Sequence, residues 1–169
     1  MHIFLTGPIG IGKSTIIRRA LDITKLRYAG FRTSFPGDRA APDRRLHMGD
    51  IRLPIPTDEG SVVARFSEGC PHPDPARFNE LGCALIREAR QSAELIVMDE
   101  LGFLERDAYL FQAEILSTLD GTAPVLGVVR QGAEGWLQAV VRHPNVEVLP
   151  VSIENRDALA RELIARFGN

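Results

Sequence analysis

The sequence predicts an α/β fold in which helices flank a mainly parallel sheet. Short apolar segments that suit strands alternate with segments of helical periodicity from residue 75 onward. Residues 95–98 (Leu-Ile-Val-Met) are apolar at every position, which is typical of a central parallel strand covered on both faces. A glycine-rich turn lies between the first expected strand and the first expected helix. Right-handed crossovers should connect the parallel strands.

The expected elements follow from apolar spacing and from Pro, Gly and Asp clusters. An apolar strand at 2–6 and a helix at 14–25 come first. Residues 28–68 then contain short β-type pieces at 28–35, 46–53 and 61–67, so we expect a hairpin or meander excursion after the first helix. The remaining elements are predicted as helices at 75–93, 107–119, 132–142 and 155–167 and strands at 95–98, 124–129 and 146–151.

The whole chain has the composition of an ordinary globular protein. Its 169 residues suit one domain over 1–169, and 44% of them are hydrophobic and 25% charged. A net charge of −2 does not favour nucleic acid as a partner. Neither a leader nor an apolar span is predicted, so no membrane association and a cytoplasmic location are expected. Cys70 and Cys83 do not have zinc-ligand spacing, and no protein partner is indicated.

A phosphate-binding loop is the strongest motif in the chain. Residues 7–14 fit G-x-x-x-x-G-K-[ST] between an expected strand and an expected helix, as the motif requires. The glycines let successive backbone N–H groups point into one concavity, and the helix that follows adds its free N–H groups. Lys13 should reach the β- and γ-phosphates, and Ser14 should coordinate Mg²⁺. The predicted nucleotide-binding residues are Gly7, Pro8, Ile9, Gly10, Ile11, Gly12, Lys13, Ser14 and Thr15, with Thr15 placed at the α-phosphate.

Asp99 and Glu100 follow the apolar segment 95–98 and form the second part of the predicted site. In a parallel sheet the carboxyl ends of the strands are where ligands bind, so both should lie beside the phosphate loop. Asp99 is expected to hold Mg²⁺ with Ser14, although many strands end in Asp only to start a turn. Glu100 is expected to orient the attacking water or accept its proton, with a surface carboxylate as the alternative. Lys13, Asp99 and Glu100 are therefore the predicted catalytic residues.

Several basic and polar residues are weaker candidates. Arg130 and Gln131 follow the strand at 124–129 and either sense the γ-phosphate or are solvated. Arg39, with Arg44 and Arg45, lies in the excursion and either supplies an arginine finger within the chain or belongs to a solvated loop. Asn155 and Arg156 open the last helix, and capping by Asn155 is favoured over contact with base or ribose.

With these motifs in order, the chain resembles the THEP-type, or cancer-related, nucleoside-triphosphatases over nearly its whole length. The matching segments are 7–15, 29–33, 95–102 with Glu105, and 148–157. The resemblance implies a RecA-related P-loop domain that slowly hydrolyses ATP, GTP and other nucleoside triphosphates with Mg²⁺ and little base selectivity. The chain departs from the family at Phe103, where Lys is usual, and at residues 34–39. A basic contact to the phosphates is then either lost or supplied by Arg39, Arg44 or Arg45.

Three functions are consistent with these features. The first is a Mg²⁺-dependent nucleoside-triphosphatase. The second is a small-molecule or nucleotide kinase that uses residues 28–75 as an acceptor site, and the third is a nucleotide-gated binding module. A carboxylate at position 100 favours hydrolysis.

Overall fold

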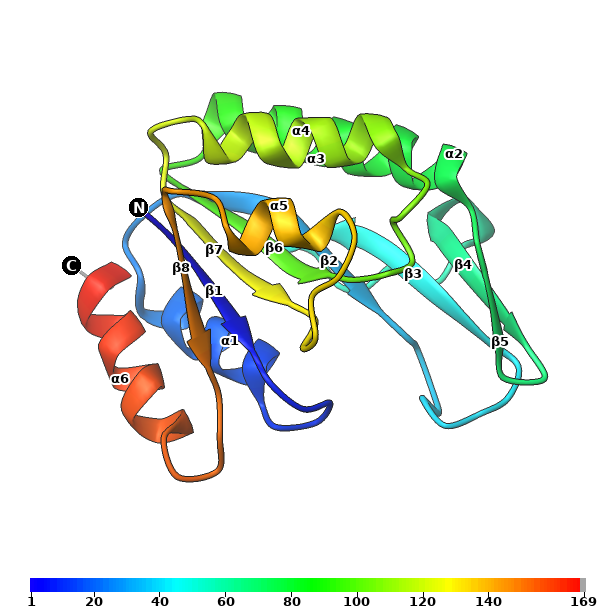
Figure 1. The fold of residues 1–169 in the computed structure, drawn as a ribbon, viewed down its shortest axis with the longest axis horizontal. Coiled ribbons are helices and arrows are strands. Elements are labelled where there is room, and N and C mark those ends of the chain that lie inside the picture. The colour runs from blue at the N-terminus through cyan, green and yellow to red at the C-terminus, as the bar shows by residue number, and fades with distance from the viewer. Residues whose placement is uncertain (168–169) are drawn as a thin grey trace.

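The computed structural model describes residues 1–167, which build one eight-stranded sheet (Figure 1). The strand order is β5-β4-β3-β2-β6-β7-β1-β8. Strands β2, β6, β7, β1 and β8 are parallel, and β3, β4 and β5 continue the sheet in antiparallel fashion. The strands are β1 (His2–Thr6), β2 (Tyr28–Ser34), β3 (Arg44–Asp50), β4 (Val62–Ser67), β5 (Cys70–Pro73), β6 (Leu95–Leu101), β7 (Val125–Val129) and β8 (Val146–Pro150).

Helices cover both faces of the sheet (Figure 1). On one face lie α3 (Cys83–Ser92), α4 (Tyr109–Leu119) and α5 (Leu137–Val141). On the other face lie α1 (Lys13–Ile23) and α6 (Arg156–Phe167). A short α2 (Pro75–Arg77) and a π-helical segment (Phe78–Gly82) lead into α3. The parallel strands are therefore covered on both sides, as the apolar sequence of β6 predicts.

Each face has its own apolar core. Under α3 and α4, the Phe111 ring meets Phe31 edge-on at 5.3 Å between centroids and stacks on Phe78 at 6.1 Å. On the other face Leu5 and Ile17 pack with α6 in a second buried cluster. The sheet is thus fixed between two packed layers, and its strand ends are held rigidly.

Most of the predicted elements are confirmed, but β6 runs three residues further than predicted, to Leu101, and so contains Asp99 and Glu100. Strand β5 is not predicted, because its sequence Cys-Pro-His-Pro carries two prolines. The helix predicted at 132–142 begins only at Leu137, because Gly132 and Gly135 have positive φ angles of 72° and 56°. The excursion predicted for 28–68 is an antiparallel meander, but its first strand, β2, pairs parallel with β6 in the centre of the sheet.

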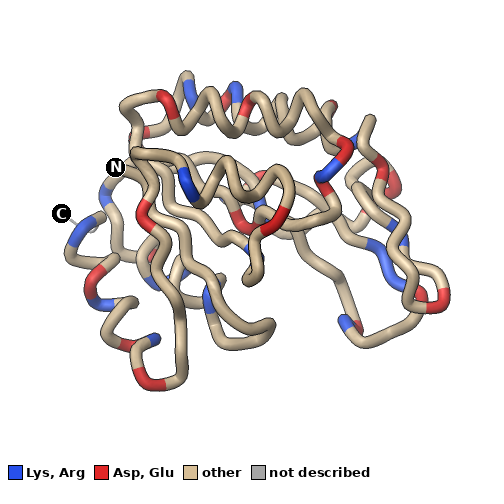
Figure 2. Tube along the Cα trace, viewed as in Figure 1, with Lys and Arg blue, Asp and Glu red and all other residues tan. Residues whose placement is uncertain are grey.

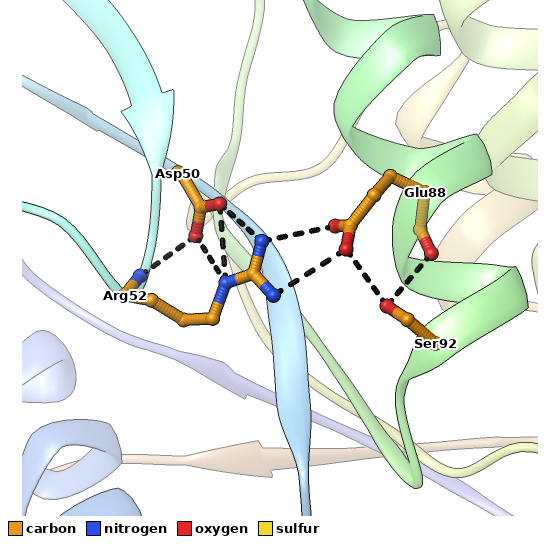
Figure 3. A network of polar contacts seen from close by, with 4 residues as sticks. All are labelled: Asp50, Arg52, Glu88 and Ser92. Atoms are coloured by element: carbon orange, nitrogen blue, oxygen red, sulfur yellow. Dashed lines mark hydrogen bonds and ion pairs between the residues drawn. The ribbon is translucent and has the colours of Figure 1, made fainter.

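A polar network joins the meander to the helical layer (Figure 3). Arg52 follows β3, and its Nη2 lies 2.5 Å from Asp50 Oδ2 and 3.1 Å from Glu88 Oε2 on α3. The Ser92 hydroxyl donates to Glu88 Oε1 at 2.8 Å. The network thereby ties the turn after β3 to α3.

Charged residues of both signs are interspersed along the chain (Figure 2). Within residues 1–167, every helix is too short or too polar to cross a bilayer.

Candidate active site

The predicted phosphate loop connects β1 to α1 at the carboxyl edge of the sheet, where the loops after β2 and β8 also lie (Figure 1). Gly7 has a φ of 143°, and a Cβ there would lie 2.7 Å from the Val151 carbonyl oxygen. Gly12, at the N-cap position of α1, is left-handed and gives the helix no side-chain cap. The first N–H groups of α1 are therefore available to an anion at this edge.

Lys13 lies inside the loop rather than in solvent. Its Nζ donates to the carbonyl oxygens of Gly7 and Pro8 at 2.8 and 2.9 Å, and the residue is 8% exposed. Burial lowers the pKa of Lys13, while the nearby carboxylates of Glu100 and Asp99 act in the opposite direction. The ammonium group thus stands beside both acidic residues that the sequence predicts for the site.

Ser14 and Asp99 meet although 85 residues separate them in the sequence. The Ser14 hydroxyl donates to Asp99 Oδ1 at 3.1 Å. Burial raises the pKa of Asp99 to about 6, and the Ser14 hydrogen bond and the charges of Lys13 and Arg32 limit that rise. One hydroxyl and one carboxylate, both hard oxygen donors, fit Mg²⁺, which keeps several waters and binds few protein ligands.

A cavity of about 270 Å³ is lined by Lys13 and Glu100, the sequence neighbours of Ser14 and Asp99. Its lining brings together residues from the phosphate loop and the start of α1, from the end of β6 and from the segment after β7: Gly7, Ile9, Lys13, Glu100, Arg130 and Gln131. Glu100, which is half-buried, therefore faces the space in front of the phosphate loop. Arg130 and Gln131 line the same cavity, and the Arg130 guanidinium stacks over the Phe103 ring, 4.9 Å from its centroid.

The three arginines of the excursion have different environments. Arg44 is stacked at 4.0 Å from the Phe66 centroid and 5.0 Å from that of Phe35. Arg45 pairs with Glu59 at 2.9 Å. Arg39 is exposed, and its charge lowers the pKa of Lys13 as the smallest of four contributions, after burial and the two carboxylates. Arg39 also lies over the Phe35 ring, at 5.9 Å from its centroid.

Asn155 serves the turn before α6. Its Oδ1 accepts from the Ser152 N–H at 2.8 Å, and its Nδ2 donates to the Pro150 carbonyl at 2.8 Å. The side chain therefore fixes the β8–α6 turn through residues that precede the helix, which differs from the expected cap on an N–H of α6. Arg156, the first residue of α6, is exposed.

Two residues near the site are absent from the sequence-based list of candidates. Arg32 is the register partner of Asp99 across β2 and β6, and its charge acts to lower the pKa of Asp99. Glu105 is buried in the loop after β6. Strand register would have identified Arg32, but the pairing of β2 with β6 is not visible in the sequence.

The comparisons with known proteins agree with this geometry. A family model described as NTPase matches residues 2–164. The chain belongs to this NTPase family. The nucleoside-triphosphatase THEP1 of Methanosarcina barkeri is 27% identical, over 99% of this chain and 97% of the relative. The cancer-related nucleoside-triphosphatase homolog of Bos taurus is 29% identical, over 98% of this chain and 96% of the relative.

The fold of the NTPase family is shared as well. The crystal structure of THEP1 from the hyperthermophile Aquifex aeolicus superposes with a TM-score of 0.80 and 20% identity, and each chain is covered completely. The predicted P-loop fold and the predicted THEP-type family are thereby confirmed. In the sheet order, β7 lies between β1, which carries the phosphate loop, and β6, which carries Asp99.

Proposed function

We propose that this chain is a Mg²⁺-dependent nucleoside-triphosphatase that converts nucleoside triphosphates to diphosphate and phosphate. The observation that carries the proposal is the 3.1 Å contact between Ser14 and Asp99 beside the buried ammonium of Lys13. These groups hold positive charge and hard oxygen ligands at one end of a helix whose first N–H groups are uncapped. The names of the Methanosarcina and Bos relatives support the same reaction.

In the proposed reaction, Glu100 accepts a proton from water while the water oxygen bonds to the γ-phosphorus. The bond from the γ-phosphorus to the β–γ bridging oxygen breaks, and its electron pair stays on the diphosphate. Lys13 and the backbone N–H groups of residues 9–15 stabilise the negative charge that develops there. Ser14 and Asp99 would hold Mg²⁺, which supplies further charge neutralisation on the phosphate oxygens when bound.

Arg39 is the arginine that we assign to the γ-phosphate, as an arginine finger within the chain. Its loop (residues 35–43) is held by hydrogen bonds from Gly69 N to Pro42 O at 2.9 Å and from Glu68 N to Asp43 Oδ1 at 3.0 Å. Arg44 stacks on the Phe35 and Phe66 rings, and its side chain would have to give up both contacts to reach the γ-phosphate. Arg130 and Gln131, which line the cavity, are proposed as γ-phosphate sensors.

The proposed roles of these residues also predict that the chain hydrolyses nucleoside triphosphates with different bases. Every contact proposed above is made to phosphate, to Mg²⁺ or to the attacking water, and none selects a base. ATP, GTP, CTP and UTP should therefore be hydrolysed at similar rates.

The test is a phosphate-release assay over these four nucleotides, with Mg²⁺ and with chelator. The chain has only two lysines, so Lys25→Ala is a matched control for Lys13→Ala. Lys25 is exposed on the segment after α1. We expect Lys13→Ala to lower kcat roughly 10²- to 10³-fold and Lys25→Ala to leave it unchanged. Equal release from both variants would refute the catalytic assignment.

A kinase would behave differently in the same assay. If residues 28–75 formed an acceptor site, turnover would depend on an added acceptor and phosphate release would be minor. Phosphate release that is undetectable under all conditions would favour a binding module instead.

A further inference from the structure

Glu105 is a buried acidic residue that the proposed reaction does not use. It lies in the loop between β6 and α4 and is only 3% exposed. Burial raises its pKa to about 7, and the negative charge of Glu100 adds to that rise. A carboxyl group without a structural or functional role is rarely kept in such a place, because burying it is costly.

Its contacts converge on the main chain just after Glu100. Glu105 Oε2 accepts from the Gly102 N–H at 3.1 Å, and the Gly102 carbonyl accepts from Trp136 Nε1 at 3.1 Å. On the other side, Gln112 Nε2 donates to the Glu105 carbonyl at 2.7 Å. The Gly102–Glu105 turn is therefore held from α4, by Gln112, and from the segment before α5, by Trp136.

The same turn adjoins a second part of the candidate site. The Arg130 N–H donates to the Leu101 carbonyl at 2.9 Å, between Glu100 and Gly102. The Arg130 guanidinium stacks on Phe103, inside the turn. Displacing the turn would therefore shift both Glu100 and Arg130 relative to the phosphate loop.

We propose that Glu105 is a positioning residue, whose carboxyl oxygen fixes the Gly102 amide and thereby holds the Glu100 carboxylate toward the attacking water. The inference rests on the proposed function, because it assigns Glu105 a part in the same hydrolysis. A displacement of about 1 Å at a reacting group can cost on the order of 10²-fold in rate. An acceptor at position 105 is the requirement, so glutamine should meet it and alanine should not.

The kinetic test compares Glu105→Ala with Glu105→Gln. We expect the alanine variant to lower kcat roughly 10²-fold with KM within about twofold, because a transition-state interaction is lost and ground-state binding is kept. The glutamine variant should recover most of that loss. Glu134→Ala, an exposed glutamate before α5, is the control and should leave kcat unchanged. The proposal would be overturned if Glu105→Ala had the same kcat as the natural chain, or if Glu105→Gln were as slow as the alanine variant.

A second readout does not depend on catalysis. Trp136 is the only tryptophan in the chain, and its indole N–H donates into the turn. Its emission should shift to the red in Glu105→Ala and stay in place in Glu105→Gln. If the natural chain releases no phosphate, the proposed function fails, whereas this emission still decides whether Glu105 holds the turn.

If Glu105→Ala does not fold, Trp136→Phe tests the turn from its other side. It removes the donor to the Gly102 carbonyl and keeps an aromatic ring. A kcat lowered by roughly tenfold at unchanged KM would support the positioning role, and an unchanged kcat would contradict it.

Discussion

The parallel part of the sheet and its antiparallel extension (β3 to β5) are stabilised in different ways. Every residue of β7 is buried, whereas three of the four residues of β5 are exposed. Burial continues into β3 and β4, where Met48 and Val63 belong to the core. At the surface of the extension, Arg45 and Arg65 both pair with Glu59, and Arg44 stacks between two phenyl rings. Burial therefore extends through the parallel strands into β3 and β4 and ends at β5, where solvated ion pairs and aromatic stacking are left.

The two regions should therefore contribute differently to the candidate site. Rigid strand ends suit residues whose positions matter to fractions of an ångström, which is where Lys13, Asp99 and Glu100 lie. The loop of residues 35–43 joins β2 to β3 and carries Arg39, the arginine that we assign to the γ-phosphate. Substitutions in the parallel part should therefore affect chemistry strongly, and those in the extension should affect it weakly or through Arg39 alone.

The sharpest contrast is between two glutamates. Glu100→Gln removes the proposed proton acceptor and should lower kcat roughly 10²- to 10⁴-fold. Glu59→Gln weakens exposed ion pairs in the extension and should leave kcat within about twofold. Steady-state phosphate release measures both. Similar losses in the two variants would contradict the proposed division between the regions.

The pH dependence of stability should have opposite signs in the two regions. The folded-state pKa of Glu105 is raised to about 7 from an ordinary 4.5, so its contribution to stability is full below about pH 4.5 and is lost as pH rises through 7. The hydrogen bond from Arg65 lowers the pKa of Glu59 from its ordinary 4.5, so its contribution to stability is present above about pH 4.5 and is lost as pH falls below that value. Glutamine has no such titration.

We therefore expect the free energy of unfolding of Glu105→Gln, relative to that of the natural chain, to rise by about 3 kcal/mol from pH 5 to pH 8. Urea unfolding at the two pH values measures this difference. The relative stability of Glu59→Gln should change little over the same range, because Glu59 is already ionised there in both the folded and the unfolded chain. If the difference in unfolding free energy between Glu105→Gln and the natural chain were the same at both pH values, Glu105 would not titrate in this interval.

Arg39 tests whether the extension contributes to the site at all. Arg39→Ala should lower kcat roughly tenfold, less than the ~10³-fold of an enclosed arginine finger, because water screens an exposed guanidinium. Arg45→Ala is the matched control, since its side chain pairs with Glu59 away from the phosphate loop. Equal rates in both variants would restrict the active site to the parallel part.

The smallest effect is expected at the network that ties the extension to α3. Arg52→Met removes the ion pairs to Asp50 and Glu88, which are partly exposed. Unfolding free energy should fall by about 1 kcal/mol or less, and kcat should not change. A loss of several kcal/mol would mean that this network, rather than strand pairing, holds the extension in place.

The approach of Ser14 to Asp99 was predictable from sequence because of a simple geometric rule. Parallel strands end at one edge, so Ser14 after β1 and Asp99 on β6 had to come close despite their separation. The choice of Arg39 over Arg44 and Arg45 was not predictable. It depends on Phe35 and Phe66, which come together from the loop after β2 and from β4 to capture Arg44.

Glu105 shows a second limit of sequence reasoning. An acidic residue followed by Arg106 and Asp107 has the local composition of a solvated loop. Its burial depends on partners from α4 and from the segment before α5, which the sequence does not place beside it. Similarly, β5 forms because β4 offers it a pairing edge, although its own residues disfavour a strand.

The two prolines of β5 have a consequence for self-association. Pro71 and Pro73 alternate along the outermost strand, so both nitrogens are oriented to the same side. Since β5 still pairs with β4, that side is the free one, and two amide donors are missing from it. A strand from another molecule could not form a complete set of backbone hydrogen bonds with β5, so this edge of the sheet is protected against edge-to-edge aggregation.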